Sequence, residues 1–143
     1  MKIARALAAA ALLATAAGPA TAHHSYAMFD NPKKQTLSGT VRALEWTNPH
    51  VWVWVNVDDG KGGTVAWGFE AQSPSELVRF FGWTRNSLTP GDKVTVDFSP
   101  LRSGRPGGAL RLLTFADGRT LKTARTNPPP GSPAELAAPG PAK

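Results

Sequence analysis

Three histidines carry the clearest metal chemistry in this sequence: His23 and His24, which are adjacent, and His50. A chain cut after Ala22 would begin at His23, whose α-amine and ring Nδ1 can then chelate one metal ion. An imidazole from His50 would complete a three-nitrogen set of the kind called a histidine brace. Copper(II) binds nitrogen sites most tightly among the divalent ions and prefers tetragonal ligation. The sequence therefore suggests a copper site at His23 and His50, with His24 as a weaker ligand.

A plainer interpretation of the same histidines stands beside this one. His23 and His24 can be a polar start of an exported chain that binds copper incidentally. His50 follows Pro49 at the mouth of a strand, where an imidazole can simply hydrogen-bond a loop carbonyl. Copper binding also requires an unprotonated α-amine, whose ordinary pKa is about 7.7 to 8.0. Such binding is expected to weaken in acid.

A second candidate site is aromatic. From His50 to Asp58 large and small side chains alternate, which places His50, Trp52, Trp54 and Asn56 on one face of a strand and four valines on the other. The valines are expected to form core, and tryptophan is a good stacking platform. The full candidate binding face comprises Trp46, Trp52, Trp54 and Asn56, with Arg102 and Arg105 in a glycine-rich loop beside it. The alternative is that at least one of these tryptophans packs as ordinary core.

Motifs of the common enzyme classes are absent from the sequence. The chain has no cysteine, no Gly-x-Ser-x-Gly, no His-Glu-x-x-His and no phosphate-binding loop. Asp58 and Asp59 are adjacent and are read as turn formers. Glu45 and Glu70 could approach each other, but nothing in the sequence indicates a catalytic pair. We therefore expect no enzyme.

The elements that must position these residues follow from alternation and turn chemistry. Ser73, Pro74 and Glu76 form a helix start, and Gly82 forms a helix stop. Gly39 predicts a bend in the first strand. The expected strands are 35–44, 50–58, 64–71, 93–98 and 109–115, with a helix at 74–81 and a short final strand at 119–122.

This order of elements predicts the fold. Three strands, one helix and two strands are the order of the OB-fold, a partly open Greek-key barrel whose second and third strands form a ligand face. The predicted class is all-β with one short helix, in a small OB-like five-stranded barrel. A split two-sheet roll could use the same elements.

The two ends of the chain differ in composition from its middle. Lys2 and Arg5 precede a short apolar stretch that ends in Ala20-Thr21-Ala22, the pattern of a cleavable signal peptide. The last 20 residues include six prolines and almost no large apolar residue, which is typical of a solvated tail. The predicted organisation is a signal peptide at 1–22, an arm at 23–34, the barrel at 35–123 and a tail at 124–143.

Composition narrows the compartment and the partners. Without the signal peptide, 14 basic side chains remain against 10 acidic ones, a net charge of +4. This charge is spread along the chain, so it favours anionic partners only weakly. No later stretch approaches the roughly 20 apolar residues of a membrane span. A periplasmic or secreted bacterial protein is expected.

Four motifs occur in order along the chain: His-His-Ser-Tyr from His23, Trp-Thr-Asn-Pro-His-Val from Trp46, Ser73-Pro74 with Gly82-Trp83, and Leu-x-Pro-Gly-Asp-x-Val-x-Val from Leu88. Together they resemble a family of short exported bacterial proteins of unknown function. The similarity runs from about His23 to Leu121 and leaves out the proline-rich tail. It implies export and the domain limits, but no activity, cofactor or catalytic residue.

Three functions remain open from the sequence. The first is an exported, non-catalytic OB-like binding or accessory module that holds a partner protein or a small ligand. The second is a copper-binding protein that uses His23 and His50. The third is a weak binder of polyanions, which would show a steep salt dependence.

Overall fold

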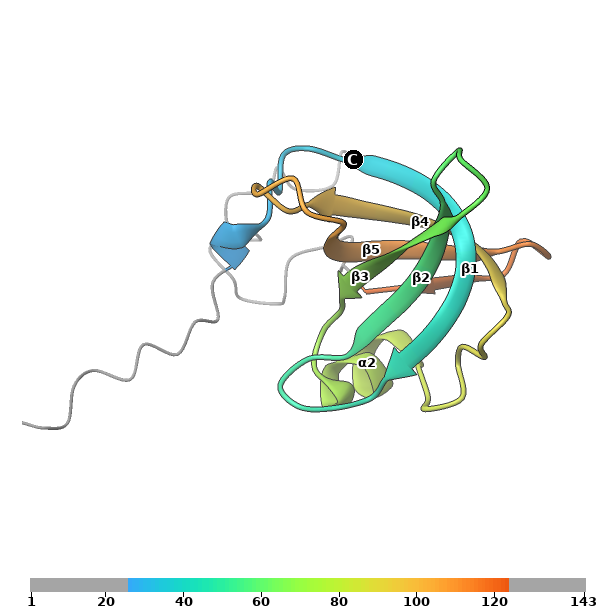
Figure 1. Ribbon diagram of the computed structural model, residues 1–143. Coiled ribbons are helices and arrows are strands. Elements are labelled where there is room, and N and C mark those ends of the chain that lie inside the picture. Colours follow the sequence, from blue (N-terminus) through green and yellow to red (C-terminus); the bar gives the residue numbers. More distant parts are fainter. Residues whose placement is uncertain (1–25, 124–143) are drawn as a thin grey trace, which may run out of the picture.

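The computed structural model describes residues 26–123, so the predicted signal peptide, His23, His24 and the tail at 124–143 lie outside the described residues. Figure 1 shows a small β-barrel with one α-helix. The elements are η1 (Tyr26–Met28), β1 (Gln35–Glu45), β2 (Trp52–Asp58), β3 (Thr64–Glu70), α2 (Pro74–Phe81), β4 (Lys93–Pro100), β5 (Gly107–Phe115) and β6 (Thr120–Lys122). In this part of the chain no helix is long and apolar enough to cross a membrane.

Five of the strands close into a barrel. β1 pairs with β2 and β4, β2 with β3, and β4 with β5, all antiparallel. A short parallel pairing of β3 with β5, from Gly68 opposite Gly107 to Glu70 opposite Ala109, closes the ring. β6 adds to β5 outside the ring. The closed barrel confirms the predicted OB-like fold and is not a two-sheet roll.

β1 pairs with both β2 and β4, and a bend in the strand allows it to reach both. Its first half, to Thr40, pairs with β4, and its second half pairs with β2 through a bulge between Val41 and Ala43. At Gly39 the strand crosses so close to β2 that a Cβ atom would lie 2.5 Å from the carbonyl oxygen of Asn56. Only glycine allows this approach. The predicted bend at Gly39 is therefore a point of backbone contact between strands.

The core lies inside this barrel. Val51, Val53 and Val55 are fully buried, as the alternation in β2 predicted. Trp83, also fully buried, follows the helix, and its indole Nε1 donates a hydrogen bond to the carbonyl of Lys122, 2.8 Å away. This bond ties the end of β6 to the segment after α2.

The helix has the predicted bounds and caps. The Ser73 hydroxyl accepts a hydrogen bond from the backbone N–H of Glu76 (3.4 Å) and donates one to the Glu76 carboxylate (2.8 Å). Gly82 ends the helix in the left-handed conformation, with φ of 70°. α2 connects β3 to β4, and Figure 1 shows it at one end of the barrel.

The arm packs onto the barrel in its described part. Phe29 is buried and forms an isolated antiparallel bridge with Leu101, in the loop between β4 and β5. The backbone N–H of Asp30 donates to Pro100, and that of Arg102 donates to Met28. Neither the 3-10 turn nor this bridge was predicted, because the arm has no periodicity and its partner is distant in sequence.

Candidate binding face

The register of the hairpin places three side chains in one row on the outer face of the barrel. Trp52 is the Cα partner of Glu45 on β1 and of Glu70 on β3. Directly opposite residues point to the same side of a sheet. Trp52 therefore lies between two carboxylates. The backbones of Glu45 and Glu70 lie two strands apart, about 10 Å from each other.

The next row on this face holds Trp54. Its ring stacks with that of Trp52, at 6.0 Å between centroids and 20° between planes. Its Cα partners are Ala43 on β1 and Gly68 on β3, both small. A small residue of β3 thus lies beside the tryptophan, and the two half-buried indoles form a continuous aromatic surface.

Trp54 carries an unusual polar atom. Its Nε1 is buried and has no hydrogen-bond partner among the described residues. A buried donor without an acceptor costs free energy, so such atoms are uncommon in folded proteins. Trp83, the fully buried tryptophan of the core, has its Nε1 paired. This contrast distinguishes Trp54 from Trp83, whose indole donor has its partner inside the fold.

His50 lies two residues before Trp52 and on the same side of the sheet. Its Nδ1 is paired with Oε1 of Glu70, an ion pair when the imidazole is protonated. The side chains are 23% and 16% exposed. A metal ion bound by His50 would therefore have to be bound by Nε2.

The residues proposed to bind copper lie only in part within the described chain. Within residues 26–123 no group of three or more His, Cys, Asp or Glu side chains could hold a metal ion. The first predicted ligands, His23 and His24, lie outside the described residues. The structure places only His50 of the proposed set.

The remaining predicted site residues lie in three different places. Trp46 packs against the edge of the core, and its carbonyl accepts a hydrogen bond from Arg85 (3.4 Å). Asn56 follows Trp54 on the same face of β2. It lines a separate hollow of about 440 Å³, whose lining also includes residues of β1 and β4. Arg102 and Arg105 line a hollow of about 360 Å³ with Trp67, which does not include Trp52 or Trp54.

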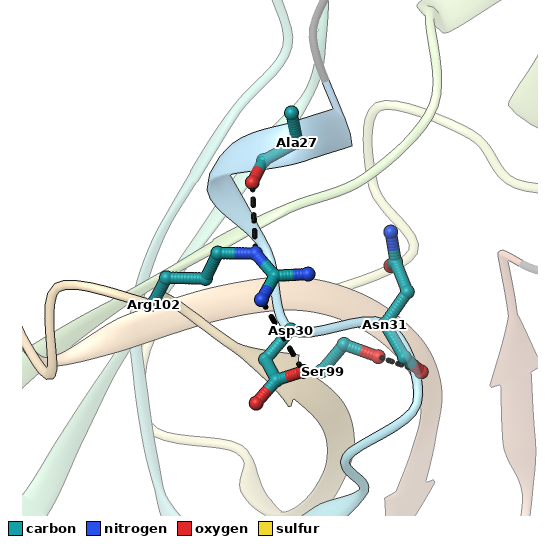
Figure 2. A network of polar contacts seen from close by, with 5 residues as sticks. All are labelled: Ala27, Asp30, Asn31, Ser99 and Arg102. Carbon is teal, nitrogen blue, oxygen red and sulfur yellow. Dashed lines mark hydrogen bonds and ion pairs between the residues drawn. The ribbon is translucent and has the colours of Figure 1, made fainter.

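Arg102 holds the arm (Figure 2). Its Nε donates a hydrogen bond to the carbonyl of Ala27 at 3.0 Å, and its Nη1 lies 3.8 Å from Oδ1 of Asp30. Nearby, the Ser99 hydroxyl donates to the carbonyl of Asn31 at 3.4 Å. The arginine predicted for the ligand face thus stabilises the packing of the arm on the β4–β5 loop.

A family model for proteins of unknown function matches residues 9–111. The chain belongs to this family, DUF6152. Within the described residues, the DUF6152 match runs from η1 into β5 and leaves out β6. No curated protein and no solved structure matches the chain. The match thus supports the part of the resemblance that concerns a family of unknown function, and it assigns no activity to the barrel.

Alternation in the expected strand 64–71 places the small residue Gly68 on the same face as the tryptophans, and the register sets it opposite Trp54 in this DUF6152 chain. Lys33 was not among the candidate site residues. Lys33 joins Arg102 and Arg105 at one hollow only through the packing of the arm. No local pattern reports such packing.

The two aspartates read as turn formers have that role. Oδ1 of Asp58 accepts from the backbone of Gly60 at 2.6 Å, and Oδ1 of Asp59 accepts from Lys61 and Gly63 at 2.8 and 2.9 Å. The hydrogen bonds from Lys61 and Gly63 hold the pKa of Asp59 below its ordinary value. These carboxylates shape the β2–β3 turn.

Proposed function

We propose that this DUF6152 protein is an exported, non-catalytic binding module, and that its ligand or partner docks on the outer face of β2 and β3 at Trp52 and Trp54. The stacked pair of indoles carries this proposal. The core is filled by the opposite face of β2, including Val53 and Val55. The two tryptophans are therefore not needed to fill the barrel.

The fold supports the same face. OB-folds bind ligands on strands two and three, and aromatic side chains there act as stacking surfaces. Glu45 and Glu70 flank Trp52 in register. Two carboxylates beside the platform make a polyanion a poor ligand for this face, so a neutral or cationic group fits it better.

Export is the part of the proposal that rests on sequence alone. The pattern that ends in Ala20-Thr21-Ala22 predicts cleavage before His23. Expression of the full chain in a bacterium, followed by fractionation and N-terminal sequencing, tests it. A periplasmic or secreted product that begins at His23 is expected, and an uncleaved cytoplasmic product would overturn it.

The binding face is tested by fragment mapping with nuclear magnetic resonance on the mature protein. We expect the fragments that bind to cluster on the indole N–H signals of Trp52 and Trp54. Trp52→Ala should abolish this cluster, whereas Val78→Ala, which trims an exposed residue (56%) on α2, should preserve it. A cluster elsewhere, or none, would contradict the proposed face.

Copper binding is the second candidate function, and the pairing of the His50 ring with the Glu70 carboxylate is the observation that favours it. A metal-bound histidine commonly has its other ring nitrogen held by a carboxylate, which fixes the tautomer and the ring orientation. Nδ1 of His50 is held in this way. The α-amine and ring of His23 would complete the copper site, with His24 as an auxiliary ligand.

The test is a copper(II) titration of the mature protein with an authentic His23 terminus. Tight one-to-one binding is expected, and it should be lost in His50→Ala and in a version with one additional N-terminal residue. Glu70→Gln should weaken binding about 10- to 100-fold. Binding that ignores both His50 and the added residue would reduce the terminal histidines to an incidental chelator.

A further inference from the structure

We infer that the hollow between the arm and the β4–β5 loop is an anion-binding site for one phosphate or carboxylate group of a small molecule. It lies apart from Trp52 and Trp54, so it goes beyond the function proposed above. The hollow has a volume of about 360 Å³ and includes Lys33, Arg102 and Arg105 among its lining residues, with Trp67 on one side.

The charge of the hollow is unbalanced. Asp30 is its one acidic lining residue, against three basic ones. Asp30 lies 3.8 Å from Arg102, so its charge is already directed to that arginine. Lys33 and Arg105 form no side-chain ion pair or hydrogen bond with any residue in the described range. Two positive charges at one hollow therefore lack a counter-charge from the described protein.

Arg102 is held in place before any ligand arrives. Figure 2 shows its guanidinium between Ala27 and Asp30, with Nε on the carbonyl and Nη1 toward the carboxylate. Its Nη2 makes no hydrogen bond to a described residue, and the side chain is 58% exposed. A guanidinium already fixed by two contacts loses less conformational entropy when it binds an oxyanion.

The loop and the volume of the hollow suit a small ligand. The N–H of Gly104, a residue with φ of 73°, donates a hydrogen bond to the carbonyl of Leu101, so the loop is a closed turn. Trp67, which packs edge-on against Phe98, is also among the lining residues. The hollow has room for a small molecule that carries one anionic group. It therefore differs from a surface for a polyanion, which needs many contacts along a groove.

The experiment is a titration of the mature protein with inorganic phosphate, and separately with acetate, at constant ionic strength. The signals followed are the amides of Gly104 and Arg105 and the indole N–H of Trp67. Lys33→Ala and Arg105→Ala are the variants, because neither side chain forms an ion pair or a hydrogen bond in the described range. Lys61→Ala, which removes the same charge from the β2–β3 turn, is the control.

We expect saturable shifts of these three signals, with Lys33→Ala and Arg105→Ala each weakening binding roughly two- to fivefold. Lys61→Ala should leave the affinity unchanged. Saturation with phosphate alone would assign a phosphate, and saturation with acetate as well would assign oxyanions in general. Shifts that do not saturate, or a loss in Lys61→Ala equal to that in Lys33→Ala, would overturn the site and leave the Trp52 and Trp54 proposal unaffected.

Discussion

The indole of Trp54 lies over Gly68 and occupies the space in which any side chain at that position would stand. A Cβ atom built on Gly68 would lie 2.8 Å from Cζ3 of Trp54 and 3.0 Å from its Cη2. The two residues are Cα partners across the β2–β3 hairpin. The position of the outer aromatic surface is therefore set by the absence of a side chain on the neighbouring strand.

Gly68→Ala is expected to displace the Trp54 ring and to lower the free energy of unfolding by about 1–3 kcal/mol, because the added methyl overpacks the contact. Chemical denaturation measures the loss, and tryptophan fluorescence reports the moved ring. In a Trp54→Ala background the same substitution should cost much less.

Gly39→Ala is the control for this cycle. The atoms that block it are the backbone carbonyl oxygen of Asn56 and Cγ1 of Val55, neither of which belongs to Trp54. Its cost should therefore be the same with and without Trp54. Equal coupling of both alanines to Trp54 would contradict the contact described here.

Trp54→Phe and Trp83→Phe should differ strongly in stability. The Trp54 substitution removes a buried donor that lacks a partner and keeps a ring on the surface, so we expect a change within about 1 kcal/mol. The Trp83 substitution opens space in the core and leaves the carbonyl of Lys122 without its 2.8 Å donor, so about 2–4 kcal/mol should be lost. Thermal and denaturant unfolding of both variants would check this, and equal losses would show that Trp54 is ordinary core.

Local pattern predicted the parts of this fold that local chemistry determines. The helix bounds followed from Ser73, Pro74 and Gly82, and the face of β2 followed from strict alternation. β2 begins at Trp52 and not at His50, although Val51 still exchanges backbone hydrogen bonds with the segment after β3. The error is confined to the end of the strand, where pattern gives no boundary.

Tertiary packing determined what the sequence could not supply. The parallel pairing of Gly68 with Gly107 joins strands separated by the helix and β4. The bridge of Phe29 with Leu101 brings the arm to the β4–β5 loop, and with it Lys33 to Arg105. Arg102 was predicted to face a ligand beside the tryptophans, but the fold uses it on the arm. Residue types were readable in advance, but their neighbours depended on long-range contacts.

Arg102→Ala is expected to loosen the arm with little effect on the barrel. The substitution removes the hydrogen bond to Ala27 and the contact with Asp30, while the backbone bridge of Phe29 remains. Hydrogen exchange should rise for Asp30 and Lys33, whose backbone N–H groups donate hydrogen bonds within this region. The free energy of unfolding should fall by less than about 1 kcal/mol. Arg105→Ala should leave the exchange unchanged, because Arg105 lies on the same loop and its side chain makes no hydrogen bond or ion pair among the described residues. Faster exchange throughout the barrel would contradict a local role for Arg102.

Acid should loosen the β2–β3 turn through Asp59. The backbone N–H groups of Lys61 and Gly63 stabilise its charged form and lower its pKa from the ordinary value of 3.8. Because the folded pKa is the lower one, the stabilisation is present above the ordinary value and is lost as the pH falls through the folded pKa. A carbon-13 titration of the Asp59 carboxyl should give the lowered pKa, and exchange at Lys61 and Gly63 should rise over the same range of pH. Asp59→Asn keeps an acceptor oxygen but has no charge to titrate, so its turn should lose this pH dependence. If the dependence persists in Asp59→Asn, another group controls the turn.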